Sequence, residues 1–166
     1  MEANLIIVAA TDSTFWVARY SEYRLELWGT DGVLHRRLEL ARDWYPPAAA
    51  NRSPVDLVRP IGCVIDIQPD EHGHLLVLLY RARKDWQASG ESRGGERPVM
   101  IPSDYMRYVD EVVEVLDSST GAVLGQVTHE GDPLAGILAD GRIFGFHADS
   151  LGRQLPSVWR LVHPPQ

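Results

Sequence analysis

The segment that decides the fold is Cys63–Tyr80, which reads CVIDIQPDEHGHLLVLLY. It contains an apolar run, Cys63–Ile67, then the turn sequence Asp70-Glu71-His72-Gly73, and then a second apolar run, Leu75–Tyr80. Asp closes local turns through side-chain hydrogen bonds and Gly accepts positive φ, so this order is typical of a β-hairpin. Because the second run is continuously apolar over five residues, we expect a strand that is covered on both faces.

The same hairpin pattern occurs twice more along the chain. One further hairpin is expected from Leu5–Ala10 and Phe15–Tyr20, and the other from Leu134–Leu138 and Ile143–Phe146. Each of the three hairpins is followed by an alternating third strand, and the first two also by a fourth strand. The expected third strands are Tyr23–Trp28, Val112–Leu116 and Val158–Val162, and the fourth strands are Val33–Leu40 and Val123–Thr128. A repeating four-stranded unit is the signature of a β-propeller blade.

The sequence therefore predicts an all-β fold of β-propeller blades, each a four-stranded antiparallel sheet, within a single domain over residues 1–166. About three blades are expected, at about 4–43, 61–130 and 133–163, and the last lacks one strand. Three blades are half of a six-bladed ring.

Composition and charge fit a compact globular domain and exclude several classes of partner. The chain has 45% hydrophobic and 23% charged residues, which argues against disorder. The net charge of −7 opposes nucleic-acid binding, and no apolar run reaches the roughly 18 residues of a membrane span. The single Cys63 excludes an internal disulfide and is expected to be buried. Leu5–Ala10 is too short for a signal-peptide core, so a cytoplasmic location is the default expectation.

Two long insertions, Arg42–Pro60 and Arg81–Arg107, interrupt the regular spacing. With up-and-down strands, both connections follow an even-numbered strand and should leave the same edge of the molecule, where a binding site would be sought. Trp, Tyr and Arg are enriched at the energetic centres of interfaces, and Arg pairs with carboxylates. The candidate ligand- or partner-binding residues are Asp43, Trp44, Tyr45, Arg59, Arg81, Arg83, Asp85, Trp86, Tyr105 and Arg107. The alternative is that the Trp residues only pin these loops against the sheets.

Candidate chemistry is sparse. His72 and His74 share a parity and are weak candidates for a metal site, although the same turn also reads as a plain polar hairpin turn. Asp66 is the sole carboxylate inside the expected inner strands and could join a buried hydrogen-bond network. No catalytic motif, nucleotide-binding glycine loop or cofactor is identified, so no catalytic residue is assigned.

The turns and strands also resemble those of a known family. The residues that carry the resemblance are 23–32 (YRLELWGTDG), 44–47 (WYPP), 70–77 (DEHGHLLV), 113–117 (VEVLD) and 138–145 (LADGRIFG). They resemble the C-terminal half of bacterial six-bladed β-propellers of the NHL and TolB-like kind. The resemblance implies a propeller fold. Many such proteins are exported and bind partners or ligands, and some relatives are metal-dependent lactonases.

Three blades alone would leave two apolar faces open. The residues expected there are Leu5, Ile7, Phe15 and Val17 at one end, and Ile143, Phe146 and Trp159 at the other. Two copies related by a two-fold axis could close a six-bladed ring, so a homodimer is expected. Other blades on another polypeptide, or a longer parent protein, are the alternatives. The expected function is a non-catalytic protein- or ligand-binding scaffold, and the alternative is a metal-dependent hydrolase or lactonase-like enzyme on a completed ring.

Overall fold

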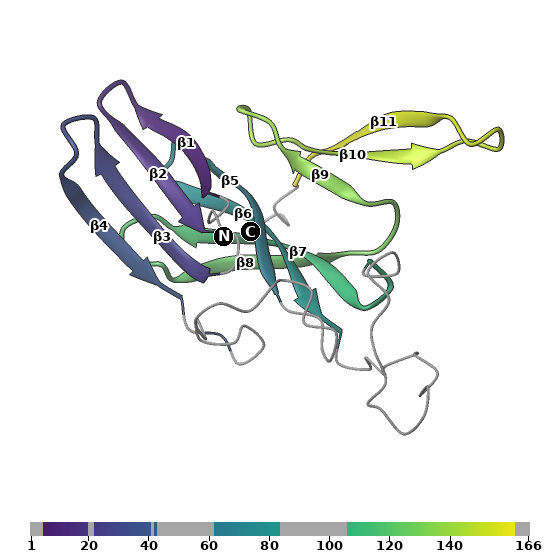
Figure 1. The fold of residues 1–166 in the computed structure, drawn as a ribbon, viewed down its shortest axis with the longest axis horizontal. Coiled ribbons are helices and arrows are strands. Elements are labelled where there is room, and N and C mark those ends of the chain that lie inside the picture. The colour runs from purple at the N-terminus through teal and green to yellow at the C-terminus, as the bar shows by residue number, and fades with distance from the viewer. Residues whose placement is uncertain (1–4, 20–21, 41, 43–61, 84–105, 162–166) are drawn as a thin grey trace, which may run out of the picture.

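The described part of the chain forms three antiparallel sheets in sequence order (Figure 1). A computed structural model describes residues 5–19, 22–40, 42, 62–83 and 106–161. The first sheet consists of β1 (Leu5–Thr11), β2 (Thr14–Arg19), β3 (Glu22–Gly29) and β4 (Leu34–Glu39). The second consists of β5 (Cys63–Pro69), β6 (His74–Ala82), β7 (Val109–Asp117) and β8 (Val123–His129). The third consists of β9 (Leu134–Ile137), β10 (Ile143–Ala148) and β11 (Gln154–Trp159). This all-β arrangement of four, four and three strands is as predicted.

The second sheet lies between the other two and is covered on both faces. Its inner strand β5 contacts β1 on one side and β9 on the other, so the first strands of the three sheets are neighbours. Alternate residues of β6 enter different cores: Leu75, Val77 and Leu79 pack with the first sheet, and Leu76 and Leu78 pack with the third. The continuous apolar run of β6 is thus explained by burial on both faces.

The predicted turns close as their residue types require. Gly32, Gly73, Gly121 and Gly141 all have positive φ, between 74° and 83°, a region in which residues with a Cβ are disfavoured. In the turn after β7, Asp117 Oδ1 accepts the backbone N–H groups of Ser119 and Thr120, at 2.8 Å each. Hydrogen bonds from this turn, first among them that from the Ser119 hydroxyl, lower the pKa of Asp117 to about 2. Local side-chain chemistry therefore sets the strand ends.

One strand lies elsewhere than predicted. The third strand of the third sheet is Gln154–Trp159, four residues earlier than the expected Val158–Val162. A tight turn closes directly after β10, with the Gly152 N–H donating to the Asp149 carbonyl at 2.9 Å. Pro156 argues against a strand on sequence alone, but β11 is the last described strand of its sheet, and edge strands tolerate proline.

A buried carboxylate joins the first sheet to the second. Glu114 of β7 is fully buried and accepts hydrogen bonds from the Tyr23 hydroxyl, at 2.5 Å, and from Arg42, at 3.1 Å. The Arg42 guanidinium carbon also lies 5.4 Å from the centre of the Tyr23 ring. A buried charge is tolerated only when paired, so the three groups fix how the two sheets sit on each other.

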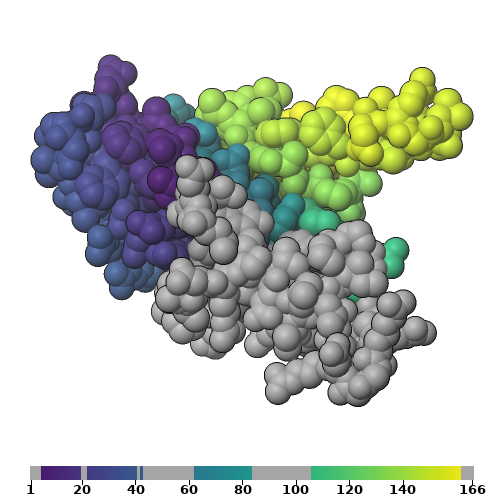
Figure 2. All heavy atoms as spheres, in the orientation of Figure 1, coloured from purple at the N-terminus to yellow at the C-terminus, as the bar shows by residue number. Residues whose placement is uncertain are grey.

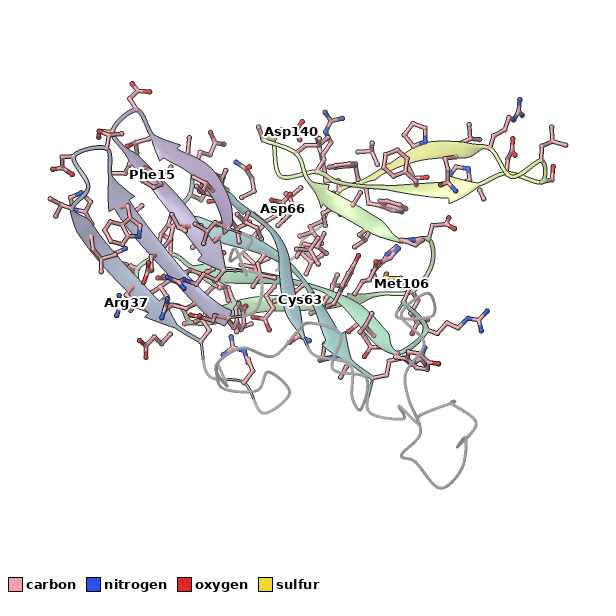
Figure 3. All side chains as sticks on the ribbon, in the orientation of Figure 1. Phe15, Arg37, Cys63, Asp66, Met106 and Asp140 are labelled. Atoms are coloured by element: carbon pink, nitrogen blue, oxygen red, sulfur yellow. The ribbon has the colours of Figure 1, made fainter. Side chains whose placement is uncertain are left out.

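Two carboxylates hold the third sheet to the second. Asp66 of β5 accepts the Ile137 N–H at 2.7 Å, and Glu111 of β7 accepts the Leu134 N–H at 3.0 and 3.1 Å. Both donors belong to β9, and Asp66 lies in the space between β5 and β9 (Figure 3). A Cβ at Gly136 would stand 2.8 Å from the Asp66 carboxylate, so only glycine allows this close approach.

The hydrogen bond between Tyr23 and Glu114 can be tested with a double-mutant cycle. Tyr23→Phe keeps the ring over Arg42 but removes the hydroxyl, and we expect a loss of about 1.5–3 kcal/mol in the free energy of unfolding. Urea unfolding of Tyr23→Phe, Glu114→Gln and the double variant should give a coupling of about 1 kcal/mol or more. Strictly additive losses would contradict the contact.

The close approach of β9 to Asp66 can be tested with two Gly→Ala variants. We expect Gly136→Ala to lower the free energy of unfolding by about 1–3 kcal/mol, because its methyl group overlaps Asp66 and the Phe144 ring. Gly125→Ala on β8 is the matched control, since its methyl group would meet nothing within 4 Å. Urea unfolding measures both. Equal effects would show that β9 does not pack as described.

Candidate functional site

The outward face of the first sheet is largely apolar. Residues paired across strands point to the same face, and the register joins Ile7 with Val17, and Ala9 with Phe15 and Trp28. Leu5 is 50% and Ile7 is 61% exposed, whereas Phe15 and Val17 are half-buried. We call this surface the first open face; it consists of Leu5, Ile7, Ala9, Phe15, Val17 and Trp28. Phe15 is labelled on it in Figure 3.

Charged side chains border the first open face on β3 and β4. Glu26 is only 8% exposed and lies 3.0 Å from Arg37 and 3.3 Å from Arg24. The Trp28 indole N–H donates to the other Glu26 oxygen at 3.1 Å. Arg24 also pairs with Glu22 at 3.0 Å. The face therefore combines an apolar centre with a fixed, partly desolvated carboxylate.

The third sheet has a second open face, on the side away from the second sheet. Cross-strand pairing places Phe144 opposite Val158, and Phe146 opposite Pro156. Phe146 is 44% and Val158 is 51% exposed, and the two Phe rings meet edge to face with centroids 6.2 Å apart. The second open face consists of Phe144, Phe146, Pro156 and Val158. The hairpin β10–β11 projects from the rest of the molecule (Figure 2).

Two residues predicted for the open end of the third sheet lie on its other face. Ile143 is 3% exposed and packs with the second sheet, together with the half-buried Trp159. Ile143 pairs with Trp159 across the strands, so both point away from Phe144 and Phe146. The prediction of an open apolar face is confirmed for Phe146, as it is for Leu5 and Ile7, and is wrong for Ile143 and Trp159.

The edge from which the long insertions leave carries a hollow. β4 and β6 both end on the lower side of the molecule in Figure 1, as the up-and-down strand order predicts. The hollow has a volume of about 480 Å³ and lies at this end of β6, β7 and β8. Its lining residues are Arg83, Met106, Val109, Asp110, Glu111, Thr128, His129, Glu130, Gly131 and Pro133.

Three of the predicted binding residues are described, and two of them lie beside Asp110; of these two, Arg83 lines the hollow. Arg81 lies 3.0 Å and Arg83 lies 4.0 Å from the carboxylate of Asp110, whereas Arg107 is an exposed residue just before β7. The other predicted binding residues, Asp43, Trp44, Tyr45, Arg59, Asp85, Trp86 and Tyr105, lie outside the described residues.

Sequence reasoning did not identify Glu111 and His129, which line the hollow, or Tyr80, which pairs with Glu111. Burial raises the pKa of Glu111, despite the N–H of Leu134 that its carboxylate accepts. Burial, with Glu111 beside it, raises the pKa of Tyr80 to about 12. His129 pairs with Glu111 across β7 and β8 and bonds to the Asp132 carbonyl at 3.0 Å. Only the pairing register, which the sequence does not reveal, brings these groups together.

The weak metal candidates His72 and His74 belong to the β5–β6 turn. His74 Nδ1 lies 2.8 Å from the Asp70 carboxylate, and the same carboxylate accepts the backbone N–H groups of both histidines at 2.8 Å. The polar-turn interpretation accounts for these contacts. In the described ranges, no three His, Cys, Asp or Glu side chains gather closely enough to hold a metal ion.

Comparison with known proteins does not identify a family. No protein-family model matches the chain, and a search of the curated proteins finds no match. The resemblance to NHL and TolB-like propellers therefore remains a prediction. Within the described part of the chain, no helix is long and apolar enough to cross a membrane.

The burial of Glu111 predicts a pH dependence of stability. Between the ordinary value of 4.5 and its raised pKa, the folded protein holds a proton that the unfolded chain has lost. Protonation of Glu111 therefore favours the folded state at lower pH, and the free energy of unfolding falls as pH rises through that range. We expect Glu111→Gln to flatten this decline in urea unfolding measured across the range.

Glu130→Gln is the control for this experiment, because it removes an exposed carboxylate from the same hollow. Parallel stability curves for wild type and Glu111→Gln would contradict the assigned role of Glu111.

Proposed function

We propose that the chain is a non-catalytic binding scaffold: about three blades of a β-propeller, completed to a six-bladed ring by a second copy. The stacked sheets and the adjacency of β1, β5 and β9 support a radial arrangement of blades. A scaffold of this kind acts through the surfaces that it presents rather than through bond chemistry.

The observation that carries the proposal is the contrast between the middle sheet and the end sheets. In the middle sheet, Leu75, Val77 and Leu78 are fully buried, because both faces are covered. Among the described strands, none covers one face of the first sheet and one face of the third, and Ile7 and Phe146 are exposed there. Exposed apolar patches bordered by polar groups mark interaction surfaces.

The loop-bearing edge is the proposed position for a ligand or partner on the completed scaffold. Arg81 and Arg83 stand there beside Asp110, at the end of β6 from which the longer insertion leaves. Guanidinium groups at such an edge recognise carboxylates of a peptide or small molecule. This role follows from placement and charge, and it extends the sequence-based prediction for these residues.

Self-association is tested by measuring absolute mass with light scattering after size exclusion, over a dilution series. We expect a dimer of about twice 18.6 kDa at micromolar concentrations, dissociating on dilution. Folding is checked in parallel by circular dichroism. A folded monomer at every concentration would contradict completion by a second copy.

A further inference from the structure

Positions along the third strands of the three sheets can be compared from their pairing with the second strands, which is regular in the second and third sheets and shifts between Ala18 and Arg19 in the first. Phe15, Leu75 and Ile143 pair with Trp28, Leu116 and Trp159 in their respective third strands. Tyr23, Glu111 and Gln154 each lie five residues before these partners along β3, β7 and β11. By position in the third strand, they are equivalent. Counting back two residues makes Glu26 and Glu114 equivalent in the first and second sheets.

Glu26 is the counterpart in the first sheet of Glu114, the residue that binds the preceding sheet. In the second sheet, Glu114 points toward the preceding sheet and accepts the hydroxyl of its Tyr23 at 2.5 Å. Glu26 occupies the same position on the first open face, on which no other described sheet packs. Arg37 and Arg24 lie 3.0 and 3.3 Å from one Glu26 oxygen, and the Trp28 indole N–H donates to the other at 3.1 Å. A carboxylate can accept about four hydrogen bonds. The first open face thus retains an acceptor for a neighbouring sheet.

The second open face has the complementary half of the contact. Phe144 and Phe146 are equivalent to Trp16 and Ala18, because the same register places them on β10 and β2. Trp16 is 3% exposed and Ala18 is fully buried where the first sheet packs on the second. Gln154, equivalent to Tyr23, is exposed and carries an amide N–H₂ that can donate. The third sheet thus exposes the positions that the first sheet buries.

We infer that two copies meet head to tail, with the second open face of each packing on the first open face of the other. Gln154 of one copy then donates to Glu26 of its partner copy, as Tyr23 does to Glu114 within the chain. This inference rests on the proposed self-association and specifies its geometry. Three sheets per copy close a ring of six after two such contacts, and a closed ring leaves neither face exposed.

Single-face variants test this geometry. Ile7→Asp disables the first open face and Phe146→Asp disables the second; both side chains are exposed, so each fold should survive. In a head-to-tail dimer of either variant alone, both contacts include a disabled face. We therefore expect the dissociation constant to rise about 100-fold or more. An equimolar mixture of the two variants retains one intact contact and should form a one-to-one heterodimer. Light scattering and native mass spectrometry, with one variant mass-tagged, measure both results.

Leu124→Asp is the matched control, because Leu124 is 55% exposed on β8 of the middle sheet and belongs to neither open face. We expect it to dimerise as the wild type does. Gln154→Ala should raise the dissociation constant about tenfold, whereas Gln126→Ala on β8 should leave it unchanged.

Each alternative gives a different pattern. Loss of the dimer in only one of the two face variants would show like faces packing together, and would overturn the head-to-tail inference alone. A dimer that survives both variants, or a mixture without heterodimer, would also overturn the inference. A wild-type monomer at all concentrations would overturn the proposed self-association as well.

Discussion

The structure depends on a buried charge between its first two sheets. Glu114 is fully buried in an otherwise apolar interface, where an unpaired carboxylate would cost several kcal/mol. Tyr23 and Arg42 both reach it, one from β3 and the other from just after β4. Apolar side chains can slide past one another at little cost, but the hydrogen bonds from Tyr23 and Arg42 to one Glu114 oxygen constrain where the two sheets lie. The hydrophobic contact supplies the stability, and the carboxylate supplies the register.

Carboxylates also hold the third sheet, but there they accept backbone N–H groups rather than side-chain donors. β9 has only four residues, so its backbone forms few ladder hydrogen bonds, and two of its N–H groups are bound by carboxylates of the second sheet. Burial raises the pKa of both Asp66 and Glu111, although each accepts backbone N–H donors. Desolvation thus outweighs hydrogen bonding at both sites. The contacts that set the orientation of the third sheet therefore carry a desolvation cost.

The sequence predicts the strands well, because burial on both faces gives β6 a continuous apolar run and Gly marks the turns. The sequence predicts less well on which face of a sheet each side chain lies. Glu111 and Glu114 are charged residues of β7, yet both are buried, since the second sheet is covered on both faces and each carboxylate has a partner in a neighbouring sheet. Pro156 conceals β11, and an error in parity placed Ile143 on the open face. Of the predicted site residues, Arg81 and Arg83 are near the hollow because strand order alone fixes the edge at which β6 ends. The carboxylates and His129 depend on the cross-strand register, which no local pattern reveals.

Association and ligand binding are linked by symmetry in a ring of this kind. A head-to-tail ring of two copies has its two-fold axis along the ring axis, and rotation about that axis keeps each copy the same way up. In the proposed ring, the edges bearing Arg81 and Arg83 would therefore lie on one side, and the two hollows would face in the same direction. A partner with two matching groups could engage both at once, which raises its apparent affinity by effective concentration rather than by new contacts. An isologous pairing of like faces would turn the two edges to opposite sides and remove this advantage. The geometry of the dimer thus decides whether the loop-bearing edges act as one bivalent surface or as two separate sites.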